Sequence, residues 1–183
     1  ELLGVIKDLV PKVGNNNNSN NITFQIFLDE KCKDAMCLDK FMNGLTIKLQ
    51  DLLEQKRLGY VGGVGNTIVK SLKELKLEER PIHCTDMKEG IFYIKGDEGW
   101  RNETGEKITE VIANTENKAI IGLNKIWEEE FGENWQNSEE HTVKYMEVLS
   151  SITKKPTETE LQKIKSNICK SVYVKINELV NNI

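Results

Sequence analysis

Residues 80–100 read RPIHCTDMKEGIFYIKGDEGW and carry the clearest β-sheet signal of the chain. Residues 82–84 and 91–95 have the composition of two short strands, and the polar segment 87–90 between them is typical of a turn. A second glycine-bounded turn follows, and we expect the ring of Trp100 to close over the strands. The stretch therefore predicts a small β-hairpin.

The sequence after the hairpin predicts three helices. Apolar residues recur at helical spacing along one broad face of residues 104–131, which predicts a long amphipathic helix. Ser138 is placed to cap the next helix, and Thr157 with Glu160 fits a capping box at the start of a last helix that reaches the C-terminus. Helices therefore dominate, and the fold class is α+β, mainly α, with helices packed around a small β-hairpin or sheet.

The sequence before the hairpin is harder to interpret. Ile22, Phe24, Ile26 and Leu28 fall at alternate positions, with polar Thr23 and Gln25 between them, which predicts a half-buried strand over residues 22–28, although the apolar Phe27 blurs the pattern. Asp39 is placed to cap a helix that runs to about Lys56. The segment 59–65 reads GYVGGVG and predicts a glycine-rich turn, after which Asn66 caps another helix.

The chain divides into three parts. In residues 1–13 apolar residues recur at spacings of four, three and four, which is typical of a coiled coil or of a terminal helix packed on its own domain. Residues 14–21 read GNNNNSNN and predict a linker. Residues 22–183 form a single α-rich globular domain. Because the chain begins at Glu1 without a methionine, we interpret it as a fragment of a longer protein.

Composition restricts the classes of function. The 183 residues carry a net charge of -4, which argues against the whole domain acting as a clamp on phosphates. No apolar run is long enough to cross a membrane. The four cysteines are few and irregularly spaced, so we expect buried free thiols and an intracellular location.

The glycine cluster was tested as a phosphate-binding loop. Gly65 is followed by Asn66 and Thr67 with no lysine, so the Walker pattern is not met. A weak anion-binding nest at a helix N-terminus remains one interpretation. The other is a connection at which two helices pack closely, and the frequency of such glycines favours it.

His83, Cys84 and Asp86 bring a base, a thiol and a carboxylate together in one strand. A nucleophilic site needs the thiol held against the base. Consecutive residues of a strand point to opposite faces, so His83 and Cys84 cannot pair directly. The alternative is structural: Cys84 is buried, and Asp86 caps the hairpin turn through its backbone amides.

Two further sites were considered. A zinc ion would take four ligands from Cys32, Cys37, Cys84 and either His83 or His141, although the spacing favours simple burial of the cysteines. Nucleic acid would bind one face of the hairpin, with bases stacked on aromatic rings and phosphates paired with basic side chains. The residues for this interpretation are Lys88, Tyr93, Lys95, Trp100 and Arg101. Core aromatic rings with solvated lysines are the competing interpretation, because Phe92 and Tyr93 alternate faces.

Several stretches resemble one family, the C-terminal domain of proteins of unknown function encoded by giant DNA viruses. The stretches are residues 11–14 (PKVG) with the Asn run, 27–36 (FLDEKCKDAM), 58–60 (LGY), 80–86 (RPIHCTD) continuing to Trp100, 167–170 (NICK) and 173–174 (YV). Residues 80–86 are the most specific part.

The resemblance implies a longer protein with an N-terminal zinc finger, a coiled coil and an Asn-rich linker, located in the host cytoplasm, a viral factory or the virion. It carries no known activity. Where relatives show a Lys-Arg pair, this chain has Lys88 and Glu89.

We therefore expect a non-catalytic interaction and oligomerisation module without a cofactor. Its partners would be further copies of itself, a viral or host protein, or nucleic acid bound mainly by other parts of the full chain, and no membrane. Direct nucleic-acid binding is the alternative, and a nucleic-acid-processing enzyme is the second alternative. The residues expected to bind are Arg80, His83, Cys84, Asp86, Lys88, Tyr93, Lys95, Trp100 and Arg101.

Overall fold

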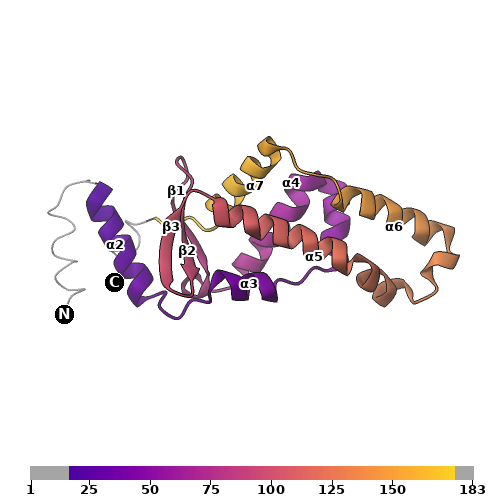
Figure 1. Cartoon of the computed structure of the whole chain (residues 1–183), viewed down its shortest axis with the longest axis horizontal. Coiled ribbons are helices and arrows are strands. Elements are labelled where there is room, and N and C mark those ends of the chain that lie inside the picture. Colours follow the sequence, from indigo (N-terminus) through magenta and orange to yellow (C-terminus); the bar gives the residue numbers. More distant parts are fainter. Residues whose placement is uncertain (1–16, 176–183) are drawn as a thin grey trace.

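The computed structural model describes residues 17–175, in which a small antiparallel sheet lies between one helix and a larger helical body (Figure 1). The α+β, mainly α, fold class is confirmed. The elements are α2 (Asn17–Glu30), α3 (Leu38–Gly44), α4 (Leu49–Lys73), β1 (Ile82–Asp86), β2 (Ile91–Gly96), β3 (Gly99–Glu103), α5 (Glu106–Phe131), α6 (Glu139–Ile152) and α7 (Glu158–Ser171), with short 3-10 turns at Leu77–Glu79 and Trp135–Asn137.

The predicted hairpin is confirmed as β1 and β2, and a third strand, β3, extends it in the order β1-β2-β3. The free edge of β1 is also covered. The N–H of Cys84 donates to the carbonyl of Val172 at 3.0 Å, and the N–H of Val174 donates back to Cys84 at 2.9 Å. The last helix therefore ends at Ser171 rather than continuing through the C-terminus as predicted.

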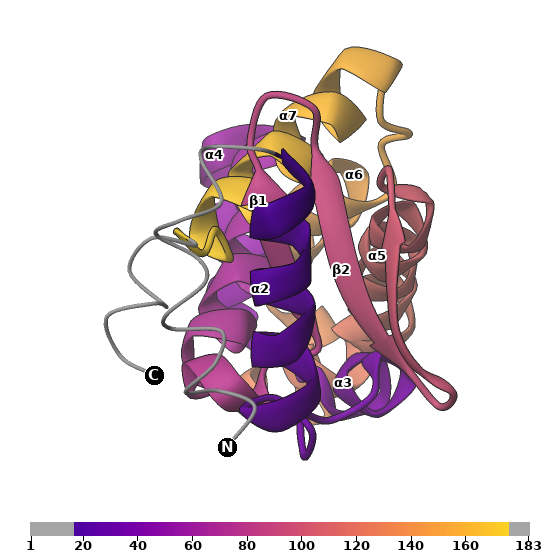
Figure 2. The ribbon, with the colours of Figure 1, turned by 90° about the vertical axis from the view of Figure 1, so that its left-hand side faces the viewer.

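The strand predicted for residues 22–28 is wrong, because these residues belong to α2. The predicted linker over residues 14–21 is likewise helical from Asn17 onward. Phe24, Phe27 and Leu28 have the i, i+3, i+4 spacing of one helix face, and all three are buried. Figure 2 shows α2 lying across one face of the sheet, in front of β1 and β2. The expected coiled-coil segment, residues 1–13, lies outside the described residues.

The single helix predicted from Asp39 to about Lys56 is two helices, α3 and α4, separated by a loop. Cys37, not Asp39, occupies the N-cap position of α3. The loop is held against α5, because the ammonium group of Lys118 donates to the carbonyls of Asn43 at 2.7 Å and Leu45 at 2.8 Å. This break creates the cavity described below.

The predicted glycine turn is present but shorter than expected: two helices meet at the non-helical residue Gly59 within α4, Leu49–Lys73, and Asn66 lies inside the second helix instead of capping it. The helix kinks at Gly59, whose φ of 72° and ψ of -177° suit glycine. A Cβ on Gly63 would lie 2.3 Å from the Cβ of Gln55, so the turns on either side of the kink approach too closely for a side chain. Close packing at Gly62 and Gly63 and the positive φ at Gly59, rather than an anion-binding nest, account for these three glycines.

Three groups of buried side chains stabilise the molecule. The central one joins the sheet to α3, α4, α5 and α7. The sheet cluster fills the space between α2 and the sheet and consists of Phe24, Phe27, Leu28, Cys32, Ala35, Tyr93 and Val174, with Trp100 packed against it. The distal cluster joins α4, α5 and α6 and includes Leu52, Ala119, Leu123, Trp127, Trp135, Val148 and Ile152, with Phe131 and Tyr145 packed against it.

The local helix signals that follow the sheet in the sequence are confirmed. α5 matches the predicted helix and buries Ile108, Val111 and Trp127. Ser138 caps α6, because its hydroxyl accepts from the N–H of His141 at 3.3 Å. The capping box between Thr157 and Glu160 starts α7 as predicted.

Candidate functional site

His83 is fully buried in β1 and faces α2. Its ring lies 5.4 Å from Trp100, 5.9 Å from Phe27 and 6.2 Å from Phe24, measured between ring centroids. Its Nε2 atom is 3.7 Å from the sulfur of Cys32, a pair that the sequence analysis missed because the two residues are far apart in the chain.

The His83 and Cys32 side chains are both held neutral. Burial, with a smaller contribution from the charge of Arg80, lowers the pKa of His83 to about 3. Burial also raises the pKa of Cys32 to about 12. Because a nucleophilic thiol needs its thiolate form and access to substrate, this pair is packed as part of the sheet cluster.

Cys84 points to the other side of the sheet, as alternation along the strand predicts. It forms a disulfide with Cys169 of α7, with 5.4 Å between the two Cα atoms. The expectation that all four cysteines are free thiols is therefore wrong for this pair. The two residues are 85 positions apart, so only the packing of α7 against β1 brings them together. Cys32 and Cys37 are free.

Asp86 and Arg80 stabilise the two ends of β1. The Oδ1 atom of Asp86 accepts from the N–H groups of Lys88 at 2.8 Å and Glu89 at 2.9 Å, which is the predicted capping of the turn. The Nε of Arg80 donates to the carbonyl of Leu75 at 3.2 Å. Arg80 and Asp86 thus use their side chains within the fold, whereas the buried Nδ1 atom of His83 has no hydrogen-bond partner in the described part of the chain.

The predicted zinc ligands do not converge. Cys84 is in a disulfide on the opposite side of the sheet from His83, and His141 packs against Phe131 at the distal end, with 4.4 Å between their ring centroids. Among residues 17–175 no three histidine, cysteine or acidic side chains are grouped so that they could hold a metal ion.

The predicted nucleic-acid face is largely covered by α2. Tyr93 is buried, with its ring 4.8 Å from that of Phe24. The ammonium group of Lys95 lies 5.7 Å from the centre of the Trp100 ring and donates to the carbonyl of Lys33 at 3.3 Å. Arg101 is paired with Glu98, and Lys88 is exposed beside Glu89. These residues do not form one open basic surface.

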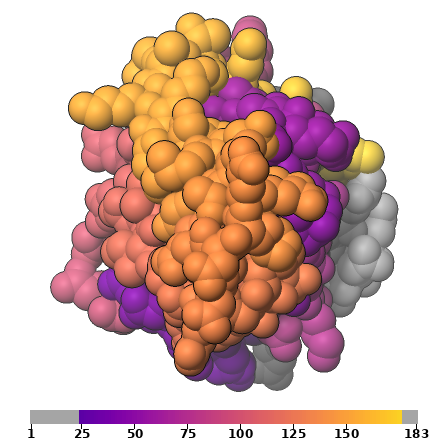
Figure 3. Space-filling model, turned by 90° about the vertical axis from the view of Figure 1, so that its right-hand side faces the viewer, coloured from indigo at the N-terminus to yellow at the C-terminus, as the bar shows by residue number. Residues whose placement is uncertain are grey.

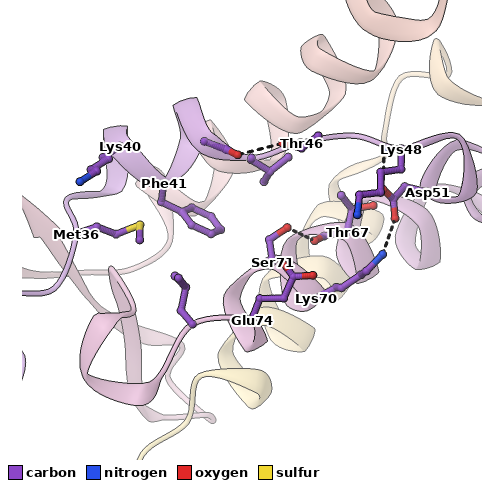
Figure 4. Close-up of a pocket in the computed structure, with 13 residues that line it drawn as sticks. Met36, Lys40, Phe41, Thr46, Lys48, Asp51, Thr67, Lys70, Ser71 and Glu74 are labelled. Carbon is purple, nitrogen blue, oxygen red and sulfur yellow. Dashed lines mark hydrogen bonds and ion pairs between the residues drawn. The ribbon is translucent and has the colours of Figure 1, made fainter. Parts of the chain in front are cut away.

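The structure instead contains a pocket that sequence analysis did not predict, between α3, the following loop and α4 (Figure 4). Its volume is about 450 Å³, within the range of small-molecule sites. We call it the α3–α4 pocket, and its lining residues are Met36, Lys40, Phe41, Gly44, Leu45, Thr46, Lys48, Asp51, Thr67, Lys70, Ser71, Glu74 and Leu75.

One end of the α3–α4 pocket is charged. Asp51, which is only 8% exposed, accepts from the N–H of Lys48 at 2.9 Å and from the ammonium group of Lys70 at 3.4 Å. The hydroxyl of Ser71 donates to the carbonyl of Thr67 at 3.0 Å. The spacing of Thr67, Lys70 and Ser71 places them on one helix face, a signal that becomes visible once α4 is known to continue past the glycines.

A second exposed feature is an apolar face on α6. Met146 is 57% exposed and Val143 is 51% exposed, and both line a shallow depression with Glu147. Glu147 forms an ion pair with Lys56 of α4, one helix turn from the exposed Leu53. We call these five residues the α6 face. Figure 3 views the end of the molecule where α6 lies in front.

No family model, curated protein or solved structure matches the chain. Among the residues that the structure describes, no helix combines the length and the apolar character needed to cross a bilayer.

Proposed function

We propose that the chain is a non-catalytic interaction and oligomerisation module. Its most chemically suggestive residues have partners within the fold: His83 packs in the sheet cluster, Cys84 is bonded to Cys169, and Asp86 caps a turn. Groups engaged in this way stabilise a shape, which favours a binding role over a reaction.

The observation that carries the proposal is the α6 face. Large apolar side chains that gather on an exposed surface are a common mark of an interaction site. Val143, Met146 and Leu53 supply apolar surface, and Lys56 with Glu147 supplies one charge of each sign.

The occupant that fits this surface best is a second copy of the chain. A two-fold axis brings the same patch of both subunits together, so the patch must be complementary to itself. If the two-fold axis passes beside the Lys56–Glu147 pair, Lys56 of each copy faces Glu147 of the other copy. The apolar residues of the α6 face on one copy would then contact the apolar residues of the same face on the other copy.

The resemblance adds a second element to the proposal. If residues 1–13 continue an upstream coiled coil, contacts between α6 faces would act within an already linked oligomer. Linked modules raise the effective concentration of every attached domain, including any finger that reads nucleic acid. A viral or host protein would be the alternative partner.

Sedimentation velocity over a range of protein concentrations tests the α6 face. We expect the chain to form a dimer and Met146→Glu to shift it toward monomer, because the new carboxylates would face each other across the two-fold axis. Met87→Glu is the matched control, since Met87 is 49% exposed in the β1–β2 turn and is not part of the α6 face. A dimer that persists in Met146→Glu, or a monomer in the unaltered chain, would refute dimerisation through this face.

A further inference from the structure

We propose that the α3–α4 pocket binds a small molecule that has an apolar body and one anionic head group. This ligand site is independent of the α6 face and of dimerisation. The proposal rests on the apolar side chains that line part of the pocket, on a lining in which three lysines outnumber two acidic residues, and on the contacts that hold the walls in place.

The apolar body would occupy the end formed by α3 and the end of α4. Met36, Phe41 and Leu75 line this part, and Figure 4 shows Met36 and Phe41, with Lys40 beside them, on the side away from Lys48, Asp51 and Lys70. Phe41 is only 5% exposed, so its ring is held by the central core and offers a rigid surface. Burial of an alkyl or aryl group here would provide affinity without a specific shape requirement.

The head group would lie between Lys48 and Lys70. The pocket as a whole is lined by three lysines (Lys40, Lys48 and Lys70) and two acidic residues (Asp51 and Glu74), which gives a net charge of +1. The carboxylate of Asp51 is already engaged by the backbone of Lys48 and by Lys70, while the ammonium group of Lys48 is exposed and forms no ion pair within residues 17–175. The positive charge of Lys48 therefore remains available to an incoming anion.

The nearby hydroxyl groups also favour an anion held by the lysines. Thr67 donates to the carbonyl of Gly63 at 3.0 Å, and Ser71 donates to that of Thr67. Their hydrogen atoms are committed to the backbone of α4. The ammonium groups of Lys48 and Lys70 are therefore the donors that remain for a carboxylate or phosphate, and bonds of this kind are among the stronger ones in proteins.

The walls of the pocket are fixed before any ligand arrives. Lys118 of α5 holds the carbonyls of Asn43 and Leu45, which anchors the loop that forms one wall. Asp51 ties the start of α4 to Lys70, which lies beyond the kink at Gly59 in the second half of α4. A preformed site of this kind loses little conformational entropy on binding.

Fluorescence of anilinonaphthalene sulfonate, which has an aromatic body and one anionic group, provides the first measurement. The bound probe is then displaced by octanoate, octyl phosphate or octanol, which share a chain length and differ in head group. We expect both anions to displace the probe, and octanol to require a concentration about tenfold higher, the difference made by one charged hydrogen bond. The anion that displaces the probe at the lower concentration, octanoate or octyl phosphate, identifies the preferred head group as a carboxylate or a phosphate. Equal displacement by octanol would overturn the proposed role of charge.

Two pairs of variants assign the binding to this pocket. Gly44 lines the pocket, and a Cβ added to it would have no atom within 4 Å, so the side chain of Gly44→Leu can be accommodated there. This variant should no longer bind probe that octanoate can displace. Asn43→Leu adds the same side chain at a neighbouring position outside the lining and should leave binding unchanged. If octanoate still displaces the probe from the Gly44→Leu variant with unchanged affinity, the binding site lies elsewhere and the proposal is overturned.

The second pair tests the lysine. Lys48→Met should weaken octanoate about tenfold and leave octanol unchanged, which also demonstrates that the pocket is still folded. Lys163→Met, an exposed lysine of α7, is the control and should change neither. Equal octanoate affinity in both variants would contradict the assigned head-group position.

Discussion

The two ends of the molecule each contain a cluster of aromatic rings with a histidine in contact, but the two histidines are buried to different extents. At the sheet end, His83 is fully buried among Phe24, Phe27 and Trp100. At the distal end, His141 is half-buried and packs on the outer side of Phe131. The distal cluster therefore has a dry, apolar centre around Trp127, whereas the sheet cluster has a titratable group at its centre.

This difference indicates two kinds of stability. The distal cluster joins three helices of the main body, so its loss should unfold the whole domain. The sheet cluster holds α2 against the sheet through Phe24, Phe27 and Leu28, which are the buried residues among those of α2 whose side chains are described. Loss of the sheet cluster should therefore release α2 first, as a local unfolding unit.

The largest effect is expected when the centre of each cluster is removed. Trp127→Ala should lower the free energy of unfolding by about 3–5 kcal/mol, because the indole is fully buried against Phe131, Trp135 and Tyr145. Urea unfolding measures this cost, and it should appear as a loss in one global transition.

Phe24→Ala is the matched substitution at the sheet end. It should have a smaller global cost, because release of α2 limits the penalty. Hydrogen exchange should then accelerate in α2 and remain slow in α5. Uniform acceleration through the whole chain would contradict the separation of the two clusters.

The next effect is the contribution of His83, at the sheet end, to the dependence of stability on pH. The folded state holds His83 neutral with a pKa of about 3, while the unfolded chain takes up a proton near the ordinary value of 6.5. The free energy of unfolding should therefore fall as the pH is lowered from about 6.5 toward 3, by up to about 1.4 kcal/mol per pH unit from this residue.

His83→Leu should remove this component of the slope between pH 7 and pH 4.5, measured by urea unfolding at several pH values. His141→Gln is the control, because its imidazole lies at the half-buried edge of the distal cluster, and the wild-type slope should remain. If His83→Leu keeps the full slope, the imidazole of His83 does not control the acid stability of the sheet end.

The comparison also explains which parts of the fold the sequence predicted. At the distal end, helix periodicity and the cap at Ser138 are local signals, and α5 and α6 follow them. At the sheet end, the sequence predicts a strand in place of α2 because Phe24, Ile26 and Leu28 fall at alternate positions, although Phe27 interrupts the pattern. Only the packing of Phe24, Phe27 and Leu28 against the sheet selects the helix.

In the candidate sites too, local geometry was predictable from the sequence and long-range contacts were not. The opposite orientations of His83 and Cys84 and the capping role of Asp86 were predicted from strand geometry and turn chemistry. The partners Cys32 and Cys169 were not, because tertiary packing alone brings them to β1. The α3–α4 pocket was missed for a related reason: the predicted continuous helix had no loop at residues 45–48.

The smallest effect tests whether a local signal specifies the distal end. Ser138→Ala removes the hydroxyl that accepts from the N–H of His141, and it should lower the free energy of unfolding by about 1 kcal/mol. Ser166→Ala, at an exposed position inside α7, should change it by less than about 0.5 kcal/mol. Thermal and urea unfolding of both variants measure the difference. If the two substitutions lower the free energy of unfolding equally, packing around Trp127 is sufficient to determine where α6 begins, and the Ser138 cap does not contribute to stability.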